Sequence, residues 1–321
     1  WNLAVKNNLD FTQCKILIIG DIMLDKYYFG KVERISPEAP VPVVNIKKEE
    51  TRLGGASNVA HNIISLGGQV LLYGAIGHDF FGKEIERMAR QKNIGTAFVK
   101  SSFPTITKAR IIGGKQQIVR LDFEEKMSLL PVDEEEIKQK ISESLNQFDI
   151  LIISDYGKGL ISDSLCQFLI SEAHANHRPV IIDPKGKNWN KYTGADLITP
   201  NVKELSDIVG YAVDNEDEAI EAAALEIIGL YHLTSLLVTR SERGMSLVSP
   251  HESIHIPTHA EEVFDVSGAG DTVIATLSIC LADGMEIQKA MQIANVAAGI
   301  VVKKIGTATL SCEELKESLK K

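Results

Sequence analysis

The chain has 321 residues, 44% of them hydrophobic, and a formal net charge of −9 from 43 acidic and 34 basic residues. This size and hydrophobic content suit one large α/β domain, and the acidic balance argues against a nucleic-acid-binding surface. The longest early apolar run, Ile16 to Ile19, is far shorter than the roughly 20 residues of a membrane span. The cysteines are scattered without metal-binding spacing, so we expect a cytoplasmic protein with neither a disulfide framework nor a zinc site.

A buried parallel strand is predicted at residues 15–19, and it breaks at Gly20 just before two acidic residues. Asp21 and Asp25 then lie past the carboxyl end of this strand, at the edge where ligands bind in open α/β sheets. The two carboxylates either hold sugar hydroxyl groups or, in the case of Asp21, cap the loop. No GxGxxG sequence follows the strand, which argues against a dinucleotide-binding site.

Two segments predict a small sheet that stands off the main domain as a lid. Residues 41–47 alternate like a strand with one solvent-facing side, and residues 105–122 alternate on both sides of Gly113-Gly114, as in a β-hairpin. Because an exposed small sheet often pairs with a copy of itself, we expect a homodimer through these strands.

Lys108 and Arg110 share one face of the predicted hairpin. A strict two-residue turn would send Arg120 to the opposite face, whereas a bulged turn would bring it alongside the other two cations. Such a basic face is either simply solvated or binds an anionic substrate, and the acidity of the remaining chain favours the second interpretation.

Gly54 and Gly55 precede a helical pattern and would let the backbone approach a ligand closely. Asn58, in the first helical turn, would face the same space. The alternative is a tight turn in which Asn58 caps the helix. His61 on this helix is expected to be packed or half-exposed, without a catalytic role.

A small-residue turn, Ser267 to Gly270, leads into Asp271 and a long apolar helix over residues 271–282. Backbone N–H groups at the positive end of such a helix form an anion cradle. Asp271 either caps the helix or accepts a proton from a hydroxyl group that attacks a bound phosphate.

Strands and helices alternate through the second half of the chain, as in βαβ units around a parallel sheet. Polar residues and glycines recur where each strand ends, and this recurrence indicates a polar ligand cleft at one sheet edge. The predicted strands cover residues 150–154, 180–183, 197–201 and 235–239.

Residues 54–58 and 265–271 together resemble the two signatures of the ribokinase (PfkB-type) family of sugar kinases. The resemblance covers essentially all of residues 1–321 as a single domain. It implies a three-layer α/β fold with a central, mostly parallel sheet flanked by helices, plus the small β-sheet lid. Val266-Ser267 departs from the more usual Thr-x pair, so Ser267 would have to supply any hydroxyl contact there.

The resemblance also implies a role for each matching residue. The implied base is Asp271, and the N–H groups of Gly268, Ala269 and Gly270 would hold the developing charge. The implied substrate-binding residues are Asp21, Asp25, Gly54, Gly55, Asn58, Lys108, Arg110, Arg120 and Lys185. The implied ATP-binding residues are Asn201, Val202, Lys203, Glu204, Thr239, Ser241 and Gly244, with Asn201 and Glu204 holding Mg²⁺ through water, and with a monovalent cation such as K⁺ as a further expectation.

Within the family, the chain is most similar to kinases that phosphorylate D-glycero-β-D-manno-heptose 7-phosphate at O1, on the route to ADP-heptose for the lipopolysaccharide core. The alternatives are a kinase for another sugar or sugar phosphate and a non-catalytic nucleotide- or sugar-binding regulator. Many of these kinases are followed by a nucleotidyltransferase domain with an HxGH motif. No HxGH occurs here, so we expect a kinase-only form or an excised half. The similarity rests on residues 20–27, 34–43, 116–124, 154–159 and 183–186.

Overall fold

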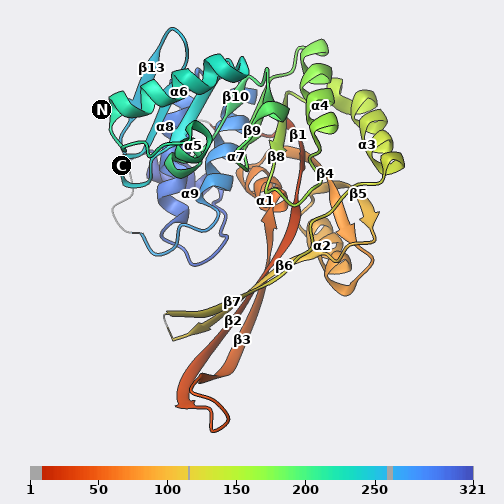
Figure 1. Ribbon diagram of the computed structural model, residues 1–321, viewed down its shortest axis with the longest axis vertical. Coiled ribbons are helices and arrows are strands. Elements are labelled where there is room, and N and C mark those ends of the chain that lie inside the picture. Colours follow the sequence, from red (N-terminus) through yellow and green to blue (C-terminus); the bar gives the residue numbers. More distant parts are fainter. Residues whose placement is uncertain (1–8, 115, 259–262, 321) are drawn as a thin grey trace.

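The computed structural model describes residues 9–114, 116–258 and 263–320, and it shows a layered body from which a long, narrow sheet projects (Figure 1). Among these residues the body contains a nine-stranded sheet in the order β13-β12-β11-β10-β9-β8-β1-β4-β5. The strands from β5 to β11 run parallel, and β12 and β13 add an antiparallel edge. Their bounds are β1 (Lys15–Gly20), β4 (Gln69–Gly77), β5 (Gly95–Ser101), β8 (Ile150–Ser154), β9 (Val180–Asp183), β10 (Leu197–Ile198), β11 (Ser235–Thr239), β12 (Met245–Val248) and β13 (Ser253–Ile256).

Helices cover both faces of the body sheet, which confirms the predicted three-layer architecture. Strand β1 is a continuous apolar run because Ile16 and Ile18 pack into one core while Leu17 and Ile19 pack into the other. One layer contains α1 (Ala56–Leu66), α2 (Phe80–Gln91), α7 (Ala269–Ala282), α8 (Ile287–Val301) and α9 (Cys312–Ser318), and the opposite layer contains α3 (Pro131–Ser144), α4 (Asp163–Ala175), α5 (Val202–Val209) and α6 (Asp217–Tyr231).

Helix α7 is apolar around nearly its whole circumference because α1 and α8 pack on it within the layer. Its length and composition fit a buried position in a large domain. In the described ranges, no helix has the length and apolarity that crossing a membrane requires.

The projecting lid has four strands in the part of the chain described, in the order β3-β2-β6-β7. These are β2 (Ile22–Ile35), β3 (Pro42–Gly55), β6 (Ile106–Gly113) and β7 (Gln116–Phe123). Two expectations were therefore wrong. The predicted strand over residues 41–47 continues to Gly55, and Asp25 lies inside β2 rather than in a loop after β1, because the chain re-enters an extended conformation directly after Asp21.

The hairpin of β6 and β7 resolves the position of Arg120. Residue 115 lies outside the described residues, and β6 ends at Gly113 while β7 resumes at Gln116. The pairing shifts register between Ile111 and Ile112, so that Arg110 lies directly opposite Arg120. This shift brings Arg120 to the face that carries Lys108 and Arg110. That is the placement expected from a bulged three-residue turn, but the irregularity lies within the strands, because Gly113 still pairs with Gln116.

Candidate active site

Asp271 lies in the first turn of α7, with 4% of its surface exposed. Two side chains from distant parts of the chain donate hydrogen bonds to its carboxylate. Asn58 Nδ2 lies 2.7 Å from Oδ2, and the hydroxyl group of Tyr156 lies 2.5 Å from Oδ1. The carboxylate is therefore held in one orientation by a residue of α1 and a residue of the loop after β8.

Burial raises the pKa of Asp271 to about 6, and the negative charge of Asp25 acts in the same direction. The hydrogen bonds from Asn58 and Tyr156 and the positive charge of Lys108 oppose this rise in pKa. A carboxylate with a pKa near the working pH is ionised in most molecules yet binds a proton readily. This combination suits a general base.

The turn before α7 forms the predicted helix N-terminus, but not all of its N–H groups are free. Gly268 has φ 79°, and a Cβ atom there would lie 2.9 Å from Asn58 Nδ2, so this position requires glycine. The N–H group of Ala269 donates to the carbonyl oxygen of Val266. The turn itself therefore uses the donor that was expected to join an anion cradle, and the Ala269 N–H group would have to share or leave this bond to contact an anion.

The inner face of the lid brings cations close to Asp271. The Arg110 guanidinium forms a 2.5 Å ion pair with Asp25, and both side chains are largely buried. The ammonium group of Lys108 lies 5.9 Å from the ring centroid of Tyr156, and burial lowers its pKa. Arg120 is half exposed and pairs with Asp122 on its own strand instead.

Asp21 does not lie where a residue that binds sugar hydroxyl groups was expected. It is 1% exposed, and its Oδ2 atom accepts hydrogen bonds from the backbone N–H groups of Tyr156 (2.8 Å) and Lys158 (3.0 Å). These contacts match the loop-cap alternative, and they leave no exposed carboxylate for a sugar. Asp21 therefore acts on the site indirectly, because it holds the loop from which Tyr156 reaches Asp271.

Gly54 and Gly55 allow close contact with the protein's own acidic residues. A Cβ atom on Gly54 would lie 2.4 Å from Asp25 Oδ2, and one on Gly55 would lie 2.5 Å from the carbonyl oxygen of Asp21. The paired glycines thus let the junction of β3 and α1 pack directly on β2. Among the described residues, the Oδ1 atom of Asn58 in the next turn is buried without a hydrogen-bond partner, so it is available to a ligand hydroxyl group.

Two loops on the other side of Asp271 contain the residues expected to bind nucleotide. Asn201 and Glu204 form a capping box at the start of α5, with Asn201 Oδ1 2.9 Å from the Glu204 nitrogen. Glu204 also forms a 2.9 Å ion pair with Lys185, whereas Lys203 is exposed and pairs with Asp207. Val202 begins the helix. Lys185 is therefore placed beside the nucleotide loop and not with the cations of the lid.

The second loop that is expected to bind nucleotide follows β11. Thr239 ends the strand and forms a β-bridge with Asn201, so the two loops lie side by side. Ser241 has φ 51°, and Gly244 has φ 83° with its position for a Cβ atom 2.0 Å from the carbonyl oxygen of Ile256. Glycine is required at position 244, where the chain turns from β11 into β12 and passes close to the end of β13.

A divalent cation can be tested against the acidic residues near these loops. In residues 9–114, 116–258 and 263–320, no group of three or more His, Cys, Asp or Glu residues could by itself hold a metal ion. The pKa of Asp183 lies well above its usual range because of burial and the charges of Asp271 and Glu204. Burial and repulsion of this kind disfavour the ionised form of Asp183, and a nearby cation would offset both. A hydrated Mg²⁺ suits such a place because it keeps several water ligands and needs few direct carboxylates.

Tyr156 was missed as a site residue by sequence reasoning, although the segment 154–159 was recognised as distinctive. The available signal was its place directly after β8, at the sheet edge where the other candidates gather. Thr307 was missed as well, and it lies 3.5 Å from Asp25 through its hydroxyl group.

Comparisons with known proteins agree with this geometry. Residues 13–314 match the family model described as pfkB family carbohydrate kinase. The bifunctional protein HldE of Haemophilus influenzae (strain PittEE) is 47% identical over 312 residues, which is 97% of this chain and 64% of that protein. HldE of Actinobacillus succinogenes is 48% identical over 311 residues, with 96% and 64% covered. The chain thus spans 64% of the length of these relatives.

Solved structures show the same fold at low sequence identity. Phosphofructokinase-2 from Escherichia coli in complex with substrates and products has a TM-score of 0.79 at 18% identity, covering 96% of this chain and 100% of that one. Arabidopsis thaliana ribokinase complexed with ribose and ATP has a TM-score of 0.76 at 20% identity, covering 96% and 99%. With the family match over residues 13–314, these findings show that the chain belongs to the pfkB family of carbohydrate kinases.

Proposed function

We propose that this chain transfers the γ-phosphoryl group of ATP to O1 of D-glycero-β-D-manno-heptose 7-phosphate, giving the 1,7-bisphosphate used in ADP-heptose and lipopolysaccharide core biosynthesis. The observation that carries the proposal is the buried carboxylate of Asp271 at the N-terminus of α7, with its pKa raised to about 6. The sequence likeness to heptose 7-phosphate kinases and the HldE relatives support the choice of sugar.

In this proposal Asp271 accepts the proton of the O1 hydroxyl group as that oxygen attacks the γ-phosphorus atom. General-base assistance of this kind contributes roughly 10²- to 10⁴-fold in rate. Each carboxylate oxygen has a second lone pair, so the sugar hydroxyl can bond while Asn58 and Tyr156 remain in place. The positive end of α7, with the N–H groups of Gly268 and Gly270, would stabilise the charge on the transferred group.

The 7-phosphate would bind to the cations on the inner face of the lid. Lys108 is near both Asp271 and Tyr156, and Arg110 is fixed by its ion pair with Asp25. Charge-assisted hydrogen bonds from such groups are the strong partners of a phosphate. Arg120 shares the face and would need to leave Asp122 to join them.

ATP would bind along the two loops after β10 and β11, with contacts from Asn201, Thr239, Ser241 and Gly244. A bound Mg²⁺ would neutralise phosphate charge, and Glu204 and Asp183 are the residues that would hold it through water. Lys185, which pairs with Glu204, is better placed to contact ATP phosphates than the sugar 7-phosphate.

The test is coupled ADP release with Mg·ATP against heptose 7-phosphate, fructose 1- and 6-phosphates, ribose and fructose, with the new phosphate located by ³¹P NMR. Turnover with heptose 7-phosphate alone, giving a 1,7-bisphosphate, is the expected result. Preferred turnover of another sugar would overturn the substrate while keeping the chemistry, and silence with every sugar would overturn the kinase. Asp271→Ala protein prepared in parallel controls for contaminating kinases.

A homodimer through the lid is also part of the proposal. Val119 and Leu121 on β7 alternate with Arg120, so they lie on the outer face of the lid, where they and Phe123 are 41%, 42% and 53% exposed. Light scattering should give a dimer mass for the wild type and a monomer mass for the double variant Leu121→Lys, Phe123→Lys. Val132→Lys, at an exposed position of α3, is the control. A monomeric wild type would contradict the dimer.

A further inference from the structure

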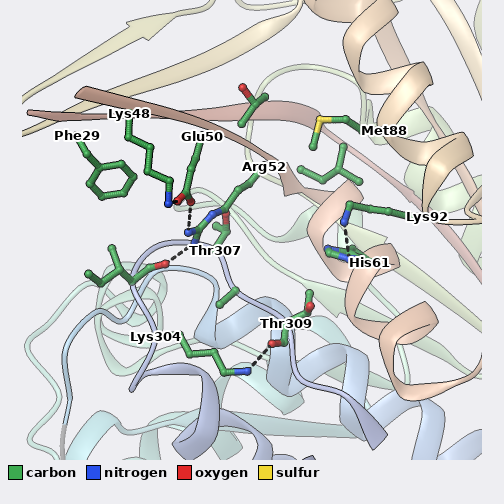
Figure 2. Close-up of a pocket in the computed structure, with 14 residues that line it drawn as sticks. Phe29, Lys48, Glu50, Arg52, His61, Met88, Lys92, Lys304, Thr307 and Thr309 are labelled. Atoms are coloured by element: carbon green, nitrogen blue, oxygen red, sulfur yellow. Dashed lines mark hydrogen bonds and ion pairs between the residues drawn. The ribbon is translucent and has the colours of Figure 1, made fainter. Parts of the chain in front are cut away.

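A separate cavity of about 760 Å³ lies at the base of the lid (Figure 2). It is bordered by residues of β3, which is an edge strand of the lid, by residues of α1, by residues at the C-terminal end of α2, and by the loop over residues 304–309. This volume is typical of sites for small organic molecules. The titratable residues that line the cavity are Lys48, Glu50, Arg52, His61, Lys92 and Lys304.

The cavity is distinct from the site around Asp271 but shares a wall with it. Thr307 lines the cavity, and its hydroxyl group also lies 3.5 Å from Asp25 Oδ2. The backbone of Thr307 donates to the hydroxyl group of Tyr27, on the strand that carries Asp25. The loop at Thr307 therefore lies between the cavity and the candidate active site.

The cavity is basic although the chain as a whole is acidic. Glu50 pairs with both Lys48 (2.5 Å) and Arg52 (2.6 Å), so one carboxylate serves two cations. Arg52 also donates to the carbonyl oxygen of Ile305, which fixes its position on the wall. Lys304 is neutralised by Glu314 outside the cavity. A net positive charge remains on the wall formed by β3.

The opposite wall holds two basic groups against each other. Lys92 Nζ lies 3.0 Å from His61 Nε2. A dashed line marks this contact in Figure 2. Burial and the charge of Lys92 lower the pKa of His61 to about 4, and burial lowers the pKa of Lys92. The ammonium group of Lys92 is half-buried, and its neighbour is a second base. A bound anion would stabilise its charged form, because an opposite charge offsets the free-energy cost of burial.

We propose that this cavity binds a small phosphorylated molecule, with anionic oxygens meeting Lys92 on one wall and Lys48 and Arg52 on the other. Phosphate suits both walls because it accepts several charge-assisted hydrogen bonds at once. The inference rests on the cavity and its charges and does not depend on the identity of the sugar that is phosphorylated near Asp271.

The test is isothermal titration calorimetry of inorganic pyrophosphate into the full chain, with the nucleotide site filled by excess non-hydrolysable ATP analogue and Mg²⁺. The wild type should bind pyrophosphate, and Lys92→Gln should weaken the affinity by about tenfold or more because one charge-assisted contact is lost. Lys83→Gln, at an exposed position of α2, the helix that Lys92 follows directly, should leave the affinity unchanged.

Lys48→Gln provides a second variant on the opposite wall and should also weaken binding. Asp271→Ala should bind pyrophosphate like the wild type, so failure of the proposed kinase activity and failure of this site give different results. Absence of pyrophosphate binding, or binding that neither Lys92→Gln nor Lys48→Gln weakens, would overturn the proposal.

Discussion

The two sides of Asp271 are held in place by different kinds of contact. On the side proposed to bind the sugar, here called the acceptor side, Asn58 and Tyr156 contact the carboxylate. They lie 213 and 115 positions away from Asp271 in the sequence. On the nucleotide side, Asn201 and Glu204 bond to each other within one helical turn. The acceptor side therefore depends on the assembled fold, whereas the nucleotide loops largely hold their own shapes.

This difference has a consequence for mutagenesis. A change on the acceptor side should alter the geometry or the pKa of the base, and leave nucleotide affinity as it was. A substitution on the side proposed to bind nucleotide can have two effects. Loss of the helix cap should lower the free energy of unfolding, and loss of a contact to the ligand should raise the Mg²⁺ concentration needed for turnover. Four predictions test this expectation, beginning with the largest effect.

Asp271→Ala should lower turnover at least about 10²-fold, because it removes the group proposed to accept the proton. The dissociation constant for ATP should be unchanged, since the loops after β10 and β11 do not depend on this side chain for their shape. Turnover is measured by coupled ADP release and ATP affinity by calorimetry. Asp283→Ala, at the exposed end of α7, is the control. Near-normal turnover would remove Asp271 as the base.

Lys108→Ala should raise KM for the sugar phosphate about tenfold and spare KM for ATP, because a charge-assisted contact to the 7-phosphate is lost. Arg110→Ala should act in the same direction and also lower the free energy of unfolding, because it leaves Asp25 buried without its ion pair. Initial-rate kinetics with each substrate varied distinguishes the two substrates. Lys31→Ala, exposed on the lid, is the control. A loss of ATP affinity instead would contradict the assignment of the lid.

Glu204→Gln should preserve the capping box, whereas Glu204→Ala should cost about 1 kcal/mol of stability. If Glu204 also holds Mg²⁺ through water, Glu204→Gln should need about tenfold more Mg²⁺ for half-maximal turnover at unchanged melting temperature. The chain contains a matched control in the second capping box, Ser311 with Glu314, where Glu314→Gln should change neither quantity. If Glu204→Gln leaves the Mg²⁺ dependence unaltered, Glu204 caps α5 and does not hold Mg²⁺.

Tyr156→Phe should have the smallest effect, a shift of the acid limb of the pH–rate profile to higher pH. The hydroxyl group of Tyr156 stabilises the ionised form of Asp271, so its removal should raise a pKa that is about 6 in the wild type. One hydrogen bond corresponds to about 0.5 to 1 pH unit. Turnover should therefore fall near pH 6 and persist near pH 8. Tyr211→Phe, at an exposed position, is the control. An acid limb that stays at the same pH or shifts to lower pH in Tyr156→Phe would contradict the proposed role of the Tyr156 hydroxyl group.

The sequence was most informative where a local pattern decides the structure. The apolar runs at residues 150–154 and 235–239 predicted their strands with the bounds observed, because buried parallel strands are apolar on both faces. Strand β2 was missed because Gly20 and Asp21 read as the end of an element. Its parallel pairing with β6 joins segments about 80 positions apart, which no local pattern encodes.

The candidate site shows the same division. Asn58 and Asp271 were each identified from the small-residue segments around them, and the structure places them in contact. The role of the Ala269 N–H group depends on the form of the turn, and the role of Asp21 depends on a loop more than 130 positions away. Residue types and spacing left Asp21 between two alternatives and gave no sign of the bond made by Ala269.

The attachment of the lid bears on how steadily the base is held. Strand β2 starts directly after Asp21, which fixes the Tyr156 loop, and β3 runs without interruption into α1, which carries Asn58. Strands β2 and β3 have 14 residues each, and about 3.3 Å per residue gives the lid a length of roughly 45 Å. The lid is attached to the body beside both residues that donate hydrogen bonds to Asp271. A displacement of the lid at these two junctions would move both residues that donate hydrogen bonds to Asp271. A partner bound to the lid would therefore also restrict the movement of the proposed base.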